Sequence, residues 1–177
     1  MTMESNSQAG QDLWVAQKLP VLPGRQRTFL DIGCGDPIHW SNTVMLEQMG
    51  WRGWGIDIGS DPALWAENRP STKFIQADAT TFDYATLMGE PRVLDYLSVD
   101  IDHPSLEALR RVMECGIKFL VATIEHDAYR FGDELRAGQR ELLLGAGYRI
   151  ERADVYAEGY PGFPFEDWIV SPEVDGV

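Results

Sequence analysis

TFLDIGCGD, residues 28–36, is an apolar run that ends in a glycine-containing turn. Its first part, Thr28 to Gly33, has the length and composition of a short buried strand. Gly33 and Gly35 have no Cβ, so the chain can turn tightly there and its backbone can approach a ligand closely. A buried strand followed at once by such a turn is typical of the first unit of a nucleotide-binding α/β sheet.

Outward from this stretch, apolar segments of strand length alternate with segments of helical periodicity. The next strands expected are Gly53 to Ile58, Lys73 to Asp78, Val93 to Asp100 and Ile117 to Ile124. Helices are expected after Ser41 or Asn42, over Pro62 to Asn68, from Pro104 onward and over Gly132 to Gly145. This alternation predicts a parallel sheet covered on both faces.

The end of the chain breaks the alternation. Tyr148 to Tyr156 and Phe165 to Val170 read as two strands whose Pro- and Gly-rich connection contains no helix. Strands joined in that way are normally antiparallel. The predicted fold class is therefore α/β and Rossmann-like, with a mostly parallel seven-stranded sheet, a C-terminal antiparallel strand and helices on both faces.

The length of 177 residues fits a single domain over residues 1–177. Residues 1–27 are expected to form an N-terminal extension with a helix from about Asp12 to Leu19. The start of the chain lacks the basic and apolar regions of a secretory signal, and Cys34 and Cys115 form no disulfide framework or metal-type pair. We therefore expect a cytoplasmic protein.

Charge and hydropathy exclude several kinds of partner. The net charge is −13, from 28 acidic and 15 basic residues, and such a surface repels phosphate backbones and anionic lipid. No apolar run reaches the ~18 residues of a membrane helix. We expect neither nucleic acid nor a membrane as partner. The residues leave the oligomeric state open, with a homodimer as one option.

Acidic residues stand at the ends of the first three expected strands, where an open parallel sheet binds its ligand. Asp31 either holds the cofactor's amino group or orients the loop. Asp57 can accept both ribose hydroxyls, and Asp78 can accept from the adenine amine. The three lie about 20 to 26 residues apart, as successive strand–helix units require. The residues expected to bind the cofactor are Asp31, Gly33, Cys34, Gly35, Asp57, Ile58, Asp78 and Ala79.

The pair Asp36-Pro37 distinguishes between cofactors. A dinucleotide-binding turn continues to a third glycine that leaves room for pyrophosphate. A carboxylate and a proline without an N–H suit pyrophosphate poorly, whereas they suit a cationic sulfonium group. The turn therefore favours S-adenosylmethionine over a dinucleotide.

From Thr28 to Val170 the chain resembles the class I S-adenosylmethionine-dependent methyltransferases. Within that group, Ser41 to Ile58, Leu94 to Leu109 and Phe165 to Val170 are similar to the FkbM-type enzymes. The resemblance implies methyl transfer to oxygen on a small-molecule acceptor, such as a sugar-like compound or a secondary metabolite. Asp102-His103 departs from the FkbM-type pattern, which usually has an acidic residue followed by glycine.

The segment VDIDH, Val99 to His103, is also similar to the IDGDH segment of metal-dependent O-methyltransferases. That resemblance implies a divalent cation held after the fourth and fifth strands, here by Asp100, Asp102 and Glu125. Carboxylates with water suit Mg²⁺ or Mn²⁺. A bound metal would lower the pKa of the acceptor hydroxyl.

Without a metal, a side chain at the same strand ends can act as general base. The catalytic candidates are Asp100, His103, Glu125 and His126. The alternative is structural: Asp102 or His103 caps the helix that follows, and Glu125 pairs with an arginine.

Methyl transfer depends on orientation in a dry pocket, which aromatic side chains can provide. The candidates for pocket walls, or alternatively for ordinary core packing, are Trp40, Tyr129, Phe131, Tyr160, Phe163 and Trp168. The segment Ala157 to Asp167 is expected to edge the acceptor site.

Three other functions compete with methyl transfer to a small molecule. A dinucleotide-dependent oxidoreductase needs room for pyrophosphate where Asp36-Pro37 stands. A non-catalytic module of the same fold would bind the cofactor without consuming it. DNA methylation is disfavoured, because the fourth strand is not followed by an Asn/Asp-Pro-Pro-aromatic turn and the chain has no Pro-Cys pair.

Overall fold

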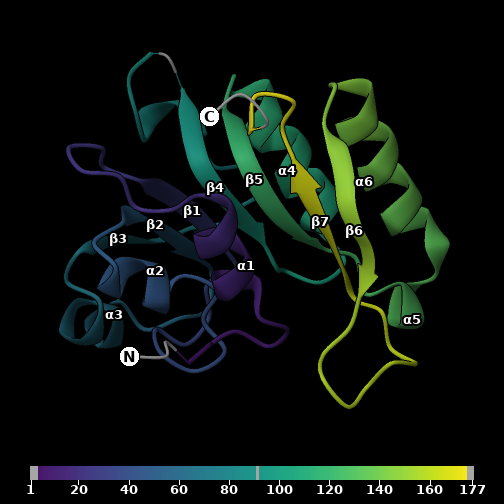
Figure 1. Ribbon diagram of the computed structural model, residues 1–177, viewed down its shortest axis with the longest axis horizontal. Coiled ribbons are helices and arrows are strands. Elements are labelled where there is room, and N and C mark those ends of the chain that lie inside the picture. The colour runs from purple at the N-terminus through teal and green to yellow at the C-terminus, as the bar shows by residue number, and fades with distance from the viewer. Residues whose placement is uncertain (1–3, 91, 175–177) are drawn as a thin grey trace.

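The computed structural model describes residues 4–90 and 92–174, which form one seven-stranded sheet with helices on both faces (Figure 1). The strands lie in the order β3, β2, β1, β4, β5, β7, β6. Their bounds are β1 Thr28–Ile32, β2 Arg52–Asp57, β3 Thr72–Gln76, β4 Val93–Val99, β5 Lys118–Glu125, β6 Arg149–Val155 and β7 Glu166–Val170. Neighbours among β1–β5 are parallel, and β7 is antiparallel to both β5 and β6. The predicted fold class is confirmed.

The strand order places the carboxyl ends of β1 to β5 along one edge of the sheet, at the bottom of Figure 1. The chain runs outward from β1 to β3 and then returns to the other side of β1 with β4. Ligands of open parallel sheets bind beyond the carboxyl ends, at such a switch in strand order. The residues that follow β1 to β5 are therefore positioned to form a site.

The helices are α1 Gln11–Lys18, α2 Val44–Gln48, α3 Pro62–Asn68, α4 Ser105–Glu114, α5 Ala128–Phe131 and α6 Asp133–Gly145, with a 3₁₀ turn η1 at Tyr84–Thr86. The sequence predicted all of these except α5 and η1. Those two elements have four and three residues, which is too short for a hydrophobic period to repeat. None of the helices among the described residues has both the length and the apolar character needed to cross a membrane.

Alternate residues of the central strands supply two cores. Phe29 and Tyr96 pack with α1 and α2, whereas Leu30 and Leu97 pack with α4 and α6. All four are fully buried. Because helices cover both faces, the central strands are apolar on both sides, and this explains their continuous apolar runs in the sequence.

The segment before α1 is fastened near the carboxyl edge by Asp12. This buried carboxylate accepts hydrogen bonds from Ser5 Oγ at 2.6 Å, Ser7 Oγ at 2.8 Å and the Asn6 N–H at 2.9 Å. The chain preceding the helix is thereby fixed in a defined path, which positions Ser7 for the site described below.

Trp168 of β7 belongs to the core. Its ring is 2% exposed and lies 4.8 Å from that of Trp14, centroid to centroid. Of the two alternatives open to this residue, core packing and an acceptor wall, the structure therefore has the first.

Glu166, at the start of β7, predicts a specific dependence of stability on pH. Burial raises the pKa of its carboxyl to about 8, although Trp168 and Gln11 donate hydrogen bonds to it. Between pH ~4.5 and ~8 the folded chain keeps a proton that the unfolded chain has lost, so stability falls as pH rises, at most about 1.4 kcal/mol per unit. In Glu166→Gln this loss should be absent. Urea unfolding should show that the free energy of unfolding of the variant rises relative to that of the parent between pH 5 and pH 8.5. An equal change in the two proteins would contradict the assignment.

Candidate active site

The turn after β1 packs directly against the exit of β4. Gly33 has φ +78°, and its N–H donates to the Ile56 carbonyl at 2.8 Å. A Cβ at this position would lie 1.8 Å from the Asp100 carbonyl oxygen and 2.5 Å from Ile101 Cγ2. Only glycine fits, so the close approach observed at Gly33 is to the backbone that follows β4.

Gly33→Ala is therefore expected to lower the free energy of unfolding by about 3 kcal/mol, from overpacking and backbone strain together. Gly35→Ala is the matched control. Gly35 also has positive φ, +50°, but the nearest atom to its added Cβ is 3.9 Å away. It should lose about 1 kcal/mol from backbone strain alone. Equal losses in urea unfolding would show that the contact with β4 is unimportant.

Asp31 and Cys34 lie beneath this turn. Asp31 is 2% exposed and accepts a hydrogen bond from Thr43 Oγ1 at 2.7 Å, and burial raises the pKa of its carboxyl. Cys34 is 6% exposed, and burial raises the pKa of its thiol. Neither side chain lines the hollows described below, so for Asp31 the geometry favours the expected alternative of orienting the loop.

Asp57 fastens the glycine turn to the loop after β2. Its Oδ2 accepts from the Gly35 N–H at 3.1 Å, and its Oδ1 accepts from the Gly59 and Ser60 N–H groups at 2.7 and 2.9 Å. A carboxylate has about four acceptor positions, so Oδ2 retains capacity for one further donor. Asp57 can thus hold the loop and a ligand hydroxyl together.

A cavity of about 390 Å³ opens beside Asp57. Four of the residues expected to bind the cofactor line it, from two successive strand ends: Asp57, Ile58, Asp78 and Ala79. Ile58 is 71% exposed, an unusual state for a large apolar side chain next to a carboxylate. The complete lining is Ile56, Asp57, Ile58, Ala77, Asp78, Ala79, Thr80, Ile101, Pro104 and Glu107.

Asp100, after β4, and Glu125, at the end of β5, form a hydrogen-bonded carboxyl pair. Burial is the main cause that raises the pKa of both groups, and the charge of Asp100 raises that of Glu125 further. Two carboxylates this close do not both ionise readily, so the pair retains one shared proton near neutral pH. The sequence predicted that both residues belong to the site, and the structure places them in contact.

Arg130 lies among the remaining acidic groups. Its Nη1 donates to Asp102 Oδ1 at 2.5 Å and to Asp127 Oδ2 at 2.7 Å. Oxygen atoms of Asp102, Glu125 and Asp127 lie within 4.8 Å of one another, a spacing that can hold a cation. A divalent ion at these oxygens would have to displace the Arg130 guanidinium, which already donates to Asp102 and Asp127. The set expected from the sequence, Asp100, Asp102 and Glu125, therefore fits Mg²⁺ or Mn²⁺ poorly.

The two histidines expected as general bases lie elsewhere. His126 is fully buried, and its Nε2 faces Asp154 and Asp167 on β6 and β7, with both N···O distances 3.7 Å. His103 is exposed, with its ring edge-to-face against Phe131 at 5.7 Å. Neither lines the hollows beside the carboxyl pair, so this geometry favours structural roles for both.

A second and larger hollow, here named the aromatic cleft, adjoins the carboxyl pair through Glu125 and has a volume of about 670 Å³. Four of the aromatic candidates line it: Trp40, Tyr129, Tyr160 and Phe163. The segment after β6, which the sequence led us to expect beside an acceptor, contributes much of its wall. The lining residues are Ser7, Gln8, Trp40, Glu125, Asp127, Tyr129, Arg130, Ala157, Glu158, Tyr160, Phe163 and Phe165.

Left-handed backbone conformations concentrate around this cleft. Trp40, Asp102 and Asp127 have φ of +55°, +55° and +43°. Asp tolerates this conformation, but it is a genuine outlier for a bulky residue such as Trp40. Strained residues of this kind collect at functional sites, where the surrounding structure fixes a side chain in a needed position.

Known structures share this architecture, although the chain matches no protein-family model and no curated protein sequence. It is similar to a chain of the fibrillarin/Nop5p complex, with a TM-score of 0.61 and 13% identity over 92% of this chain and 79% of that one. A second similar structure is the Burkholderia thailandensis 1,6-didemethyltoxoflavin-N1-methyltransferase, solved with 1,6-didemethyltoxoflavin and S-adenosylhomocysteine. Its TM-score is 0.55 and its identity 14%, over 90% of this chain and 75% of that one. For a Streptococcus thermophilus rRNA methylase the TM-score is 0.57 and the identity 13%, over 96% of this chain and 99% of that one.

The shared strand order, with an antiparallel β7 inserted next to β5, decides the classification. The chain has the class I methyltransferase fold. At these identities the likeness shows the fold alone. Several of the methyltransferase neighbours were solved with S-adenosylmethionine or S-adenosylhomocysteine bound.

In this methyltransferase fold, sequence reasoning did not single out Asp127, Arg130, Glu158, Ser7 and Gln8, which line the cleft. Asp127 and Glu158 belong to segments that had been noted, after β5 and after β6, and their charge was the available signal. Ser7 and Gln8 gave no signal, because only the folded path of the N-terminal segment brings them to the carboxyl edge.

Proposed function

We propose that the protein is an S-adenosylmethionine-dependent methyltransferase that acts on a small molecule. One observation carries the proposal. Two hollows lie at the carboxyl edge of the sheet next to the same carboxyl pair: Ile101, which follows Asp100, lines the cavity beside Asp57, and Glu125, which is hydrogen-bonded to Asp100, lines the aromatic cleft. We expect the cofactor in the first hollow and the acceptor in the second, with the proton-binding pair next to both.

The residues of the smaller cavity fit S-adenosylmethionine. Asp57 would accept from the ribose, exposed Ile58 and Ala79 would cover the adenine ring, and Asp78 would accept from its amine. Gly33 and Gly35 do not line this cavity, but the Gly35 N–H donates to Asp57 and so ties the turn to the residue expected to bind the ribose. When bound, the cofactor supplies a methyl group on a cationic sulfur that leaves as a neutral thioether.

The carboxyl pair would take up the proton that an acceptor hydroxyl loses. Glu125 faces the cleft and receives that proton, while the proton it shares with Asp100 moves onto Asp100. The pair thus carries one proton before transfer and two afterwards. Its raised pKa values favour this uptake near neutral pH. This arrangement supports O-methylation, which the FkbM-type resemblance also implies.

The same proposal places the protein in the cytoplasm, with neither nucleic acid nor a membrane as partner. The net charge of −13 and the acidic lining of the cleft support the exclusion of nucleic acid. Neighbours of this fold include an rRNA methylase, so the test must separate acceptor classes.

The experiment offers methyl-tritiated S-adenosylmethionine and the purified protein to a cell lysate that has been divided by ultrafiltration. Label should appear in a small-molecule product that chromatography separates from unreacted S-adenosylmethionine, and the amount of this product should increase with protein concentration. Label confined to the retained RNA and protein would contradict the proposed acceptor class. Cofactor binding without labelling of any fraction would favour the non-catalytic module.

Chelation is expected to leave turnover unchanged within about twofold. The reason is that the Arg130 guanidinium already occupies the Asp102 and Asp127 oxygens that a metal would need. The measurement compares rates with excess EDTA and with added Mg²⁺ or Mn²⁺. A collapse with EDTA that either ion restores would show that the metal site expected from the sequence exists.

A further inference from the structure

Most of the charged side chains that line the aromatic cleft are acidic. Glu125, Asp127 and Glu158 line it, and Arg130 is the only basic lining residue in the part of the chain that the structure describes. Arg130 already donates to Asp102 and Asp127, so its charge is balanced within the protein. A ligand in the cleft therefore meets a net negative potential.

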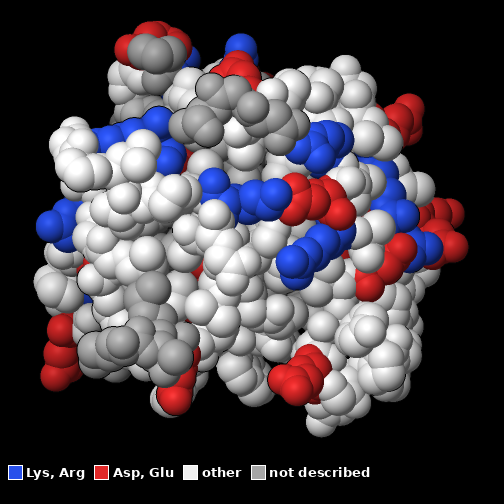
Figure 2. Space-filling model, viewed as in Figure 1, with Lys and Arg blue, Asp and Glu red and all other residues white. Residues whose placement is uncertain are grey.

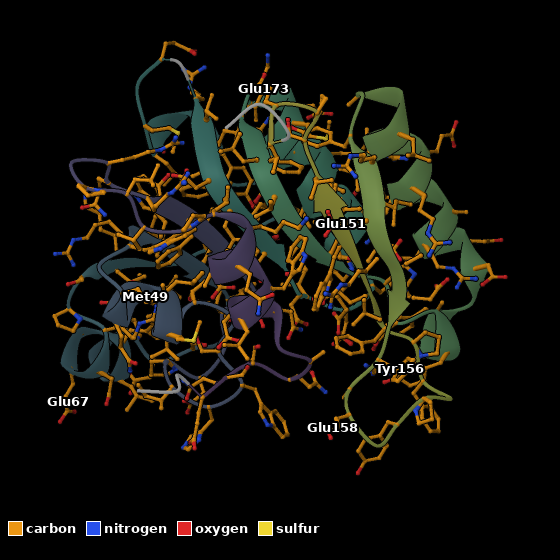
Figure 3. The ribbon with its side chains drawn as sticks, in the orientation of Figure 1. Met49, Glu67, Glu151, Tyr156, Glu158 and Glu173 are labelled. Carbon is orange, nitrogen blue, oxygen red and sulfur yellow. The ribbon has the colours of Figure 1, made fainter. Side chains whose placement is uncertain are left out.

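Figure 2 shows the same imbalance on the outer surface. The described surface at the bottom of this face carries acidic groups and no basic group. Figure 3 places Glu158 there, on the loop between β6 and β7. Glu158 is exposed and has no ion-pair partner among the described residues, so its charge is available to a ligand.

The walls of the cleft carry flat aromatic side chains, two of which are largely exposed to solvent. Trp40 is 78% exposed, and Tyr160 is 63% exposed. The rings of Tyr129 and Phe163 are fixed edge-to-face at 5.4 Å, which ties the loop to α5. Aromatic faces of this kind bind other rings by stacking and bind cations through their negative faces.

The position of Trp40 lowers the stability of the folded protein in two ways. Its backbone is left-handed, and its indole is left in water. A ligand that covers the indole would explain why the protein keeps Trp40 in this conformation.

Taken with the proposed function, on which this inference rests, we infer that the acceptor is a flat aromatic molecule that carries a protonated amine. Its ring lies against Trp40 and the aromatic residues of the loop. Its ammonium group is held by the carboxylate of Glu158. A volume of about 670 Å³ is large enough for such a molecule and its hydroxyl. The cleft charge opposes an anionic acceptor, and a neutral sugar would leave that charge unused.

The test is calorimetric titration of the protein saturated with S-adenosylhomocysteine. The probes are tyramine and 3-(4-hydroxyphenyl)propionate, which share the phenol ring and two-carbon chain but carry opposite charges. Tyramine should bind saturably and at least about tenfold more tightly than the propionate. Methyl glucoside, the neutral sugar probe, should not compete.

Two variants locate the binding. Trp40→Gly should weaken tyramine binding at least about tenfold, while its melting temperature stays equal or rises because glycine tolerates positive φ. Glu158→Gln should weaken it about three- to tenfold. Tyr156→Ala and Glu67→Gln are the matched controls: both residues are exposed and outside the cleft, and Figure 3 shows Glu67 on α3, far from the loop. The controls should bind tyramine as the parent does.

Equal affinities for the two phenols, tighter binding of the propionate, or unchanged binding by Trp40→Gly would overturn the inference. Binding of methyl glucoside alone would assign the cleft to a sugar. The proposed function fails separately. If S-adenosylhomocysteine does not bind but tyramine still binds the unloaded protein through Trp40, the cleft binds a cationic ring in a protein that is not a methyltransferase.

Discussion

Replacing Glu125 with glutamine is expected to slow methyl transfer by about 10²- to 10⁴-fold, the range typical for removal of a general base. Glutamine keeps the size of the side chain and can still accept from the Asp102 N–H, a bond that Glu125 makes at 2.9 Å. It cannot take up a proton from the acceptor. The cofactor affinity should stay within about threefold of the parent, so the loss should appear in kcat.

Asp102→Asn is the control for this variant. Asp102 stands at the same edge and pairs with Arg130, but its carboxylate is not part of the Asp100–Glu125 pair. Its turnover should remain within about tenfold of the parent. If Asp102→Asn is as slow as Glu125→Gln, or if Glu125→Gln retains full turnover, the pair is not the base.

The second large effect concerns the cofactor. Asp57→Ala should weaken S-adenosylmethionine binding by about 10- to 100-fold, because it removes one or more charge-assisted hydrogen bonds of about 1.5–3 kcal/mol. It also releases the amide groups of Gly35, Gly59 and Ser60, which hold the loop beside the cavity. Calorimetric titration of the folded variant measures the loss.

Asp61→Ala separates cofactor binding from local stability. Asp61 caps α3, where its side chain accepts from the Ala63 N–H at 2.8 Å, and it does not line the cavity. Its loss should lower the free energy of unfolding by about 1 kcal/mol while the cofactor affinity stays unchanged. An Asp57→Ala protein that is folded and binds as tightly as the parent would show that Asp57 serves only the loop.

The elements that depend on local sequence pattern could be predicted from the sequence. Strand β1 with its turn, the helix α3 and the antiparallel pair β6–β7 follow from apolar runs, Pro and Gly. The grouping of side chains beside Asp57 also followed from the sequence, because parallel strands bring their carboxyl ends to one edge. Asp57 and Asp78 therefore meet at one cavity although they are 21 residues apart.

What sequence could not decide was the direction of each side chain at that edge. Glu125 and His126 are adjacent, yet one lines the cleft and the other is buried against β6 and β7. Successive residues at a strand end point to opposite faces, so an end placed wrongly by one residue exchanges their roles. Arg130 likewise had no signal as a partner of Asp102, because a short helix, α5, brings the two together.

The most direct test of the central claim is calorimetric titration of the purified protein with S-adenosylmethionine, S-adenosylhomocysteine and, separately, NADH. The account predicts saturable binding of the two adenosyl compounds and none of NADH, with the affinity for both reduced in Asp57→Ala. Binding of NADH alone would point to an oxidoreductase. If none of the three binds the folded protein, Asp57 and Asp78 are structural, and the methyltransferase assignment is contradicted.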